Sequence, residues 1–167
     1  MNIVAKFIKA LNSDASPWQI AFAVMFALIV GLTPFWRLHN LIILCLVLGF
    51  RVNLGSFLAA LTLFSGLAYL FDPAMIGVGE GLLASESLQP FWTQLYANNL
   101  ARLGQFNHTL TLGSLSVSLL LAPFVLIATR FLVGQYRNRL RAWVNRLRIA
   151  RLLKASGVYR WYQALAD

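Results

Sequence analysis

Charged residues are scarce in this chain of 167 residues. Only 11% of them are charged, whereas 59% are hydrophobic. A soluble protein of this length usually has about a quarter of its residues charged, because its surface must face water. The composition therefore indicates a membrane protein, and the length fits a single domain.

The sequence has a single cysteine and lacks the common catalytic motifs. The single cysteine, Cys45, excludes an internal disulfide and a multi-cysteine metal site. The sequence contains no HExxH, GxSxG, Walker or GxGxxG pattern, and His39 and His108 are its only histidines. We therefore expect a protein that is not an enzyme and that holds no cofactor and no metal.

Four apolar segments predict an all-α integral membrane protein. They cover residues 17–36, 38–50, 54–71 and 109–133. About 18 helical residues span roughly 27 Å, which is close to the thickness of the hydrocarbon layer. The second segment is shorter than that. The first two segments are therefore expected to form either a short hairpin that crosses the membrane and returns, or a re-entrant pair whose turn, residues 31–40, stays at membrane depth.

Glycine and proline mark the points where these helices should turn, end or bend. Gly31 and Pro34 are expected to interrupt the helix and form the turn between the first two segments. The pair Asp72-Pro73 is expected to end the third segment. Pro123 is expected to kink the fourth.

Small residues recur along one face of the first and fourth segments. Such faces let another helix approach closely inside a membrane. The residues are Ala23, Ala27 and Gly31 in the first segment, and Ser114, Ser118 and Ala122 in the fourth.

Three further stretches are amphipathic and are expected to lie at the membrane interface. Residues 3–11 form the first, and residues 74–106 contain the second, which carries the aromatic anchors Phe91 and Trp92. The third is the basic tail, residues 134–167. Residues 1–133 are thus expected to form the membrane domain, and the tail to lie on an anionic leaflet rather than on nucleic acid.

The charge distribution predicts the orientation. Residues 130–167 carry a net charge of +8, whereas residues 72–108 carry −2. Basic flanks stay in the cytoplasm under the positive-inside rule. We therefore expect a multi-pass protein of the bacterial cytoplasmic (inner) membrane with both termini in the cytoplasm.

Polar residues at the edges of the apolar segments are the candidate binding residues. Ionisable groups there are functional candidates, and a guanidinium can bind a lipid phosphate through two hydrogen bonds. The candidates for lipid or partner binding are Arg37, His39, Asn40, Arg51, Asn53 and Asn107.

Several sequence blocks resemble a known family. The pattern Ser-Pro, Gly-x-x-Pro and Arg-x-Asn occurs at residues 16–17, 31–34 and 51–53, and LFSGLAYLFDP and FNHTLTLGS follow. Together they are similar to small bacterial inner-membrane proteins related to the domain of unknown function DUF2062, over roughly residues 5 to 130. The resemblance carries no established activity, but it implies a larger envelope protein with one membrane anchor as a partner.

The most specific expectation is a non-enzymatic inner-membrane protein that binds phospholipid and docks a partner in an envelope lipid-handling or transport assembly. Two alternatives stay open. One is a small transporter or flippase subunit that works as an oligomer, because short, interrupted helices are typical of transporter sites. The other is a lipid-modifying enzyme that depends on His39, His108 or Glu80.

Overall fold

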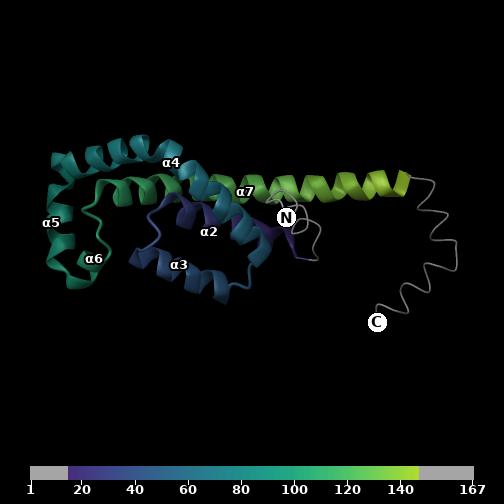
Figure 1. The fold of residues 1–167 in the computed structure, drawn as a ribbon, viewed down its shortest axis with the longest axis horizontal. Helices are drawn as coiled ribbons and strands as arrows, with labels where there is room; N and C mark the ends of the chain where they lie inside the picture. The colour runs from purple at the N-terminus through teal and green to yellow at the C-terminus, as the bar shows by residue number, and fades with distance from the viewer. Residues whose placement is uncertain (1–14, 147–167) are drawn as a thin grey trace. The chain divides into compact units, whose positions relative to one another are not determined.

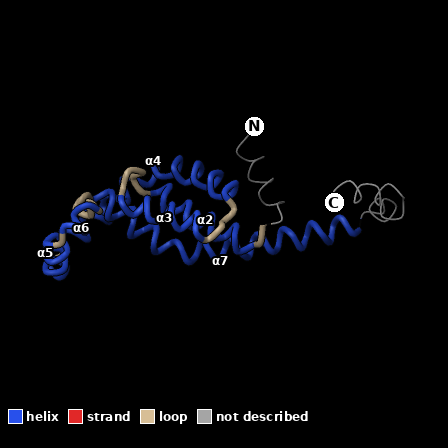
Figure 2. The backbone as a smooth tube through the Cα atoms, turned by 90° about the horizontal axis from the view of Figure 1, so that it is seen from below, coloured by secondary structure: helices blue, strands red, loops and turns tan. Residues whose placement is uncertain are grey.

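The structure, a computed structural model, describes residues 15–146, and every regular element there is helical (Figures 1 and 2). The helices are α2 (Pro17–Leu32), α3 (Leu38–Gly49), α4 (Leu54–Ala84), the short 3-10 helix η1 (Glu86–Leu88), α5 (Gln89–Ala97), α6 (Asn99–Leu103) and α7 (Thr109–Arg146). The all-α prediction is confirmed for this part of the chain. The chain divides into two compact units, Met1–Arg130 and Phe131–Asp167, and α7 contributes to both.

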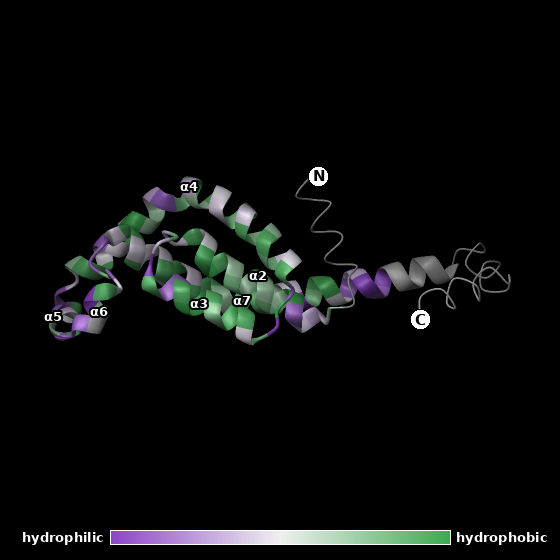
Figure 3. Cartoon of the chain, turned by 60° about the horizontal axis from the view of Figure 1, so that its bottom comes forward, coloured by the Kyte–Doolittle hydropathy of each residue, from purple (hydrophilic) through white to green (hydrophobic). Residues whose placement is uncertain are grey.

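Two helices, α4 and α7, are long and apolar enough to cross a membrane. Helices α2 and α3 are shorter, at about 24 Å and about 18 Å, so four separate crossings stay a prediction. Large hydrophobic side chains are exposed on α3, α4 and α7, where water would be unfavourable and lipid favourable. Figure 3 shows hydrophobic residues concentrated over α2 and α3, and more hydrophilic ones around α5 and α6.

Helix α2 is the buried centre of the first unit. It begins at a capping box, in which the Ser16 hydroxyl accepts from the backbone of Gln19 and the Gln19 side chain accepts from the backbone of Ser16. Pro17 suits the first turn because its missing N–H would have no helical partner there. Eleven of the sixteen residues of α2 are buried. An apolar helix with no polar face belongs in the interior, and α2 is placed there.

The main partner of α2 is α4, and small residues let the two helices approach closely. Ala23 and Ala27 are fully buried. A Cβ placed on Gly31 would lie 2.7 Å from the Cβ of Phe64 and 3.1 Å from the backbone nitrogen of Ser65. The predicted small-residue face of α2 is therefore confirmed as a packing surface.

Helix α4 does not end at Asp72-Pro73, so that prediction was wrong. The helix continues through Pro73 to Ala84. Proline removes one backbone hydrogen bond, at a cost of about 3 kcal/mol in a helix interior. Beyond the proline, Met75 and Gly79 are buried, so packing of this half of α4 offsets the local cost.

The second half of α4 packs on the start of α7 through two glycines. A Cβ on Gly79 would overlap the carbonyl of Thr109, and a Cβ on Gly113 would overlap the carbonyl oxygen of Met75. The sequence analysis did not identify this contact. The predicted small-residue face of α7 is also buried: Ser114 and Ser118 are fully buried, and Ala122 nearly so.

Helix α3 packs on the other side of α2, and aromatic rings hold the two together near the start of α2. The ring centroid of Phe50, which follows α3, lies 6.3 Å from that of Phe22 and 6.2 Å from that of Phe26. Only Asn40, Ile43 and Val47 of α3 are buried. The remaining faces of α3 are apolar and exposed, as expected for a helix in contact with lipid.

Residues 74–106 were predicted as one amphipathic stretch, but they belong to several separate helices. The first part of this stretch is the end of α4, and the rest consists of η1, α5 and α6. The indole nitrogen of Trp92 in α5 donates to the carbonyl of Leu82, 3.0 Å away, and joins α5 to the end of α4. Phe91 is exposed beside it.

Helix α7 passes through Pro123 and Gly134 and continues to Arg146, the last residue that the structure describes, so residue 133 is not a helix boundary. The predicted helix at residues 3–11 and the tail residues 147–167 lie outside the described residues.

Candidate functional site

The turn between α2 and α3 consists of residues 33–37 and is held by Asn40. The amide nitrogen of Asn40 donates to the carbonyls of Pro34, at 2.9 Å, and of Phe35, at 3.2 Å. Its amide oxygen lies 3.0 Å from the Thr33 hydroxyl, which also lies 2.8 Å from the carbonyl of Ile29. Asn40 is only 1% exposed. This predicted ligand-binding residue therefore holds the turn.

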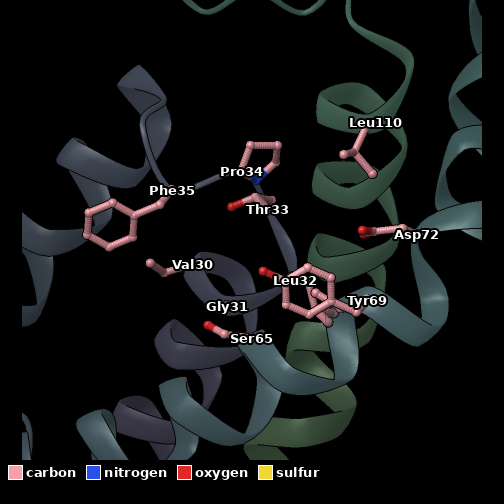
Figure 4. A pocket seen from close by; sticks show the side chains of 11 residues that line it. Val30, Gly31, Leu32, Thr33, Pro34, Phe35, Ser65, Tyr69, Asp72 and Leu110 are labelled. Carbon is pink, nitrogen blue, oxygen red and sulfur yellow. The ribbon is translucent and has the colours of Figure 1, made fainter.

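A pocket of about 260 Å³ lies beside this turn (Figure 4). Its walls come from the end of α2, the turn, the middle of α4 and the start of α7. The lining residues are Val30, Gly31, Leu32, Thr33, Pro34, Phe35, Ser65, Ala68, Tyr69, Asp72 and Leu110. Gly31 and Pro34, predicted as turn and packing residues, thus also line a cavity.

The polar side-chain groups of the pocket all end in oxygen. They are the hydroxyls of Thr33, Ser65 and Tyr69 and the carboxylate of Asp72. Figure 4 shows Asp72 extending from α4 toward the turn. The last turn of α2 forms part of the wall, and a helix C-terminus carries a partial negative charge. The pocket therefore has a negative electrostatic character.

The α3 side of the turn has the opposite character. Arg37 is the N-cap residue of α3, and its side chain makes no capping hydrogen bond. A helix N-terminus carries a partial positive charge. The Nε of Arg37 and both ring nitrogens of His39 are buried without a hydrogen-bond partner. Unpaired buried polar groups of this kind are costly, so a ligand that pairs with them is favoured.

The other end of the α2–α3 hairpin brings Arg51 and Asn53 to the start of α2. The carbonyl of Arg51 accepts from the side chain of Gln19 at 3.3 Å, and the backbone N–H of Asn53 donates to the carbonyl of Gln19 at 3.4 Å. Asn53 also caps α4, because its side chain accepts from the backbone of Ser56 at 2.7 Å. The side chain of Arg51 is exposed. These two candidates therefore lie away from the pocket.

Asn107 was predicted as a binding residue and Pro123 as a turn or packing residue. Neither is among the residues that line the pocket. Asn107 and His108 are exposed just before α7 begins. Pro123 lies inside α7 and is exposed. Among the residues that the structure describes, no group of three or more His, Cys, Asp or Glu side chains could hold a metal ion.

Asp72, Tyr69 and Ser65 line the pocket, although none of them was predicted as a binding residue from the sequence. A signal for them exists in the sequence, because positions 65, 69 and 72 follow the i, i+4, i+7 spacing of one helical face. A polar stripe on an otherwise apolar helix is typical of a face that lines a cavity. Asp72 was instead interpreted as half of a helix stop.

Comparison with known proteins gives a family and one relative. Residues 3–142 match the family described as "Uncharacterized protein conserved in bacteria (DUF2062)". An uncharacterized protein of Treponema pallidum (strain Nichols) is 27% identical over 132 residues, which cover 79% of this chain and 82% of that protein. No solved structure matches the chain. The family match extends past residue 130, farther than the resemblance at residues 5 to 130 suggested.

Proposed function

Because this chain belongs to the DUF2062 family of bacterial proteins, whose description names no activity, we propose a function from its structure. We propose that it is a non-enzymatic inner-membrane protein that binds a phospholipid at the α2–α3 turn and docks a partner in an envelope lipid-handling assembly. One observation carries the lipid proposal. A pocket and unpaired nitrogens of Arg37 and His39 occur together at the tip of an apolar hairpin.

The surroundings of the turn suit a lipid better than a soluble ligand. Phe35 and Trp36 are exposed in the turn, at 51% and 90%, and Tyr69 is exposed on α4 at 83%. Aromatic side chains at such positions favour the boundary between hydrocarbon and headgroups. The pocket wall is otherwise mainly apolar. A ligand there would therefore have acyl chains alongside α3 and α4 and a headgroup at the turn.

The phosphate of that headgroup is assigned to the start of α3. Arg37 offers a guanidinium, which matches phosphate geometry, and the N-terminal end of α3 favours an anion. The unpaired nitrogens of His39 belong to the second residue of the helix, two positions after Arg37. With both termini in the cytoplasm under the positive-inside rule, a hairpin has this turn at the outer side of the membrane, and a re-entrant pair has it at membrane depth.

The partner-docking part of the proposal rests on the exposed face of α7. Leu120, Phe124 and Ile127 are 66–69% exposed within the first unit, and all three are large and apolar. Membrane helices associate through such faces by close packing. A single-anchor envelope protein is the partner that the family resemblance implies, and self-association is the other.

The lipid proposal is tested by measuring phospholipid bound to the purified full-length protein. Arg37→Gln should lower the phospholipid retained per protein about tenfold, because a charge-assisted hydrogen bond to phosphate is lost. Arg102→Gln is the matched control, since Arg102 is an exposed arginine in α6. Arg51→Gln should have a smaller effect, because the Arg51 side chain lies at the other end of the hairpin. Equal retention by the wild type, Arg37→Gln and Arg51→Gln variants would contradict the proposal.

A small transporter subunit is the second candidate. The short helices α2 and α3 are separated by a non-helical turn that contains Pro34, and short, interrupted helices of this kind form many transporter sites. The described helices alone make a thin wall, so this function requires several copies. Native mass spectrometry that shows only single copies, with no partner, would eliminate it.

A further inference from the structure

We propose that the pocket beside the α2–α3 turn takes the primary ammonium group of an aminophospholipid headgroup, such as phosphoethanolamine. This inference rests on the proposed lipid-binding function and adds which lipid is selected. It is argued from the chemistry of the pocket wall, from the two helix ends at the turn, and from the size of the cavity.

The pocket wall offers acceptors and no competing cation. None of the residues that line it is a lysine, arginine or histidine. Among the residues that the structure describes, Asp72 forms no ion pair and no side-chain hydrogen bond that would occupy its carboxylate. The Thr33 hydroxyl uses its hydrogen within the turn, so its oxygen is free to accept. A carboxylate and hydroxyl oxygens are the partners that an ammonium group needs for its three donors.

Pro73 leaves a further hydrogen-bond acceptor on this part of α4. Since proline has no N–H, the carbonyl of Tyr69, four residues earlier in α4, lacks its usual helical donor. Tyr69 itself lines the pocket. Helix α4 therefore offers the Asp72 carboxylate and the Tyr69 phenol to the pocket, and within the same turn it has a backbone carbonyl that lacks its usual helical donor.

The two helix ends at the turn match a zwitterion. The negative end of α2 forms part of the pocket wall, and the positive end of α3 begins at Arg37, two residues after the lining residue Phe35. Two residues of extended chain cover at most about 7 Å. A headgroup whose ammonium and phosphate are separated by a short linker can therefore contact both ends at once. An anionic lipid without an amine would satisfy only the α3 side.

The size of the cavity favours a headgroup over a metal ion or a whole lipid. A volume of about 260 Å³ equals roughly nine water molecules at about 30 Å³ each. That is too large for one bare ion, and it is below the range of about 300–1,000 Å³ that is usual for drug-sized ligands. The acyl chains would lie outside the pocket, along the exposed apolar faces of α3 and α4.

The inference is tested by native mass spectrometry of the full-length protein with three lipids that have the same acyl chains. These are phosphatidylethanolamine, phosphatidylglycerol and phosphatidylcholine. The wild type should bind phosphatidylethanolamine about tenfold more tightly than either of the others, because only that lipid supplies ammonium donors to Asp72. Asp72→Asn should abolish this preference while phosphatidylglycerol binding persists. Glu80→Gln is the matched control, since Glu80 is an exposed carboxylate on the same helix, and it should keep the preference.

The outcomes separate this inference from the proposed function. If the wild type binds no phospholipid, or if Arg37→Gln leaves all three affinities unchanged, the proposed function fails. If phospholipids bind with Arg37 dependence but without preference for the amine, or if Asp72→Asn keeps the preference, only the headgroup assignment is overturned. The last measurement adds soluble phosphoethanolamine to the protein with its bound lipid. Should it displace the lipid at equimolar concentration, the ligand is a free amine and the lipid assignment is overturned.

Discussion

Replacing Gly113 with alanine tests the close contact between α4 and α7. A Cβ at this position would overlap the carbonyl oxygen of Met75 and would lie 2.8 Å from the backbone nitrogen of Gly79. Both neighbours are backbone atoms of α4, so no side chain can rotate to make room. The start of α7 and the second half of α4 would have to separate.

The magnitude follows from the difference between this site and an open one. Overpacking in a closely packed contact typically costs about 1–3 kcal/mol. Gly77 lies on the same half of α4, and a Cβ there would meet nothing within 4 Å. Gly77→Ala should therefore stabilise the helix slightly, by up to about 1 kcal/mol. The two substitutions should differ by about 1–4 kcal/mol in the free energy of unfolding.

The protein is unfolded in mixed micelles by titration with a denaturing detergent, and unfolding is monitored by tryptophan fluorescence. Trp92 reports on this region, because its indole bonds to the end of α4. The Gly113→Ala variant should unfold at a clearly lower concentration of denaturing detergent than the Gly77→Ala variant. Equal midpoints for the two variants would show that α4 and α7 do not meet at these glycines, and the reasoning would be refuted.

Three further predictions concern the hairpin. Asn40→Asp should destabilise the protein by about 2 kcal/mol or more, because an oxygen would replace the donor to the Pro34 carbonyl; the same titration measures this, and an unchanged midpoint would contradict it. Arg51 has φ 49°, so Arg51→Gly should be about 1 kcal/mol more stable than Arg51→Ala, and equal stabilities would refute backbone strain there. Trp18→Leu should cost about 0.5–2 kcal/mol, because the Arg130 guanidinium lies 4.1 Å from the ring centroid. Since that part of the loss requires the cation, Trp18→Leu should cost about 0.5–2 kcal/mol less in an Arg130→Gln background, where only the stacking of Trp18 on Phe22 is lost; an equal cost in both backgrounds would contradict the interaction.

Helix starts could be predicted from the sequence, because their signals are local. Ser16-Pro17 and Asn53 act within three residues of the helices that they begin, and the structure places them at the predicted starts. The end of α4 could not be predicted in the same way. The local cost of Pro73 is visible in the sequence, but the burial of Met75 and Gly79 depends on α7, more than thirty residues away.

The candidate site was predictable only in part, for the same reason. The turn at Gly31 and Pro34 and the edge position of Arg37 follow from residues close together in the chain. The pocket requires the turn, the middle of α4 and Leu110 to meet, and nothing in one segment specifies that meeting. The polar side chain of Asn40 suggested a ligand, although its hydrogen bonds are used by the turn itself.

The burial of α2 has a consequence for how the protein is made. The ribosome releases α2 before the other described helices, yet it becomes the most enclosed of them. Its cover is incomplete until Arg130, more than a hundred residues later, emerges and reaches Trp18. During synthesis α2 is therefore expected to lie against lipid or the insertion machinery, and a nascent chain stalled before residue 130 would lack the contact of Arg130 with Trp18.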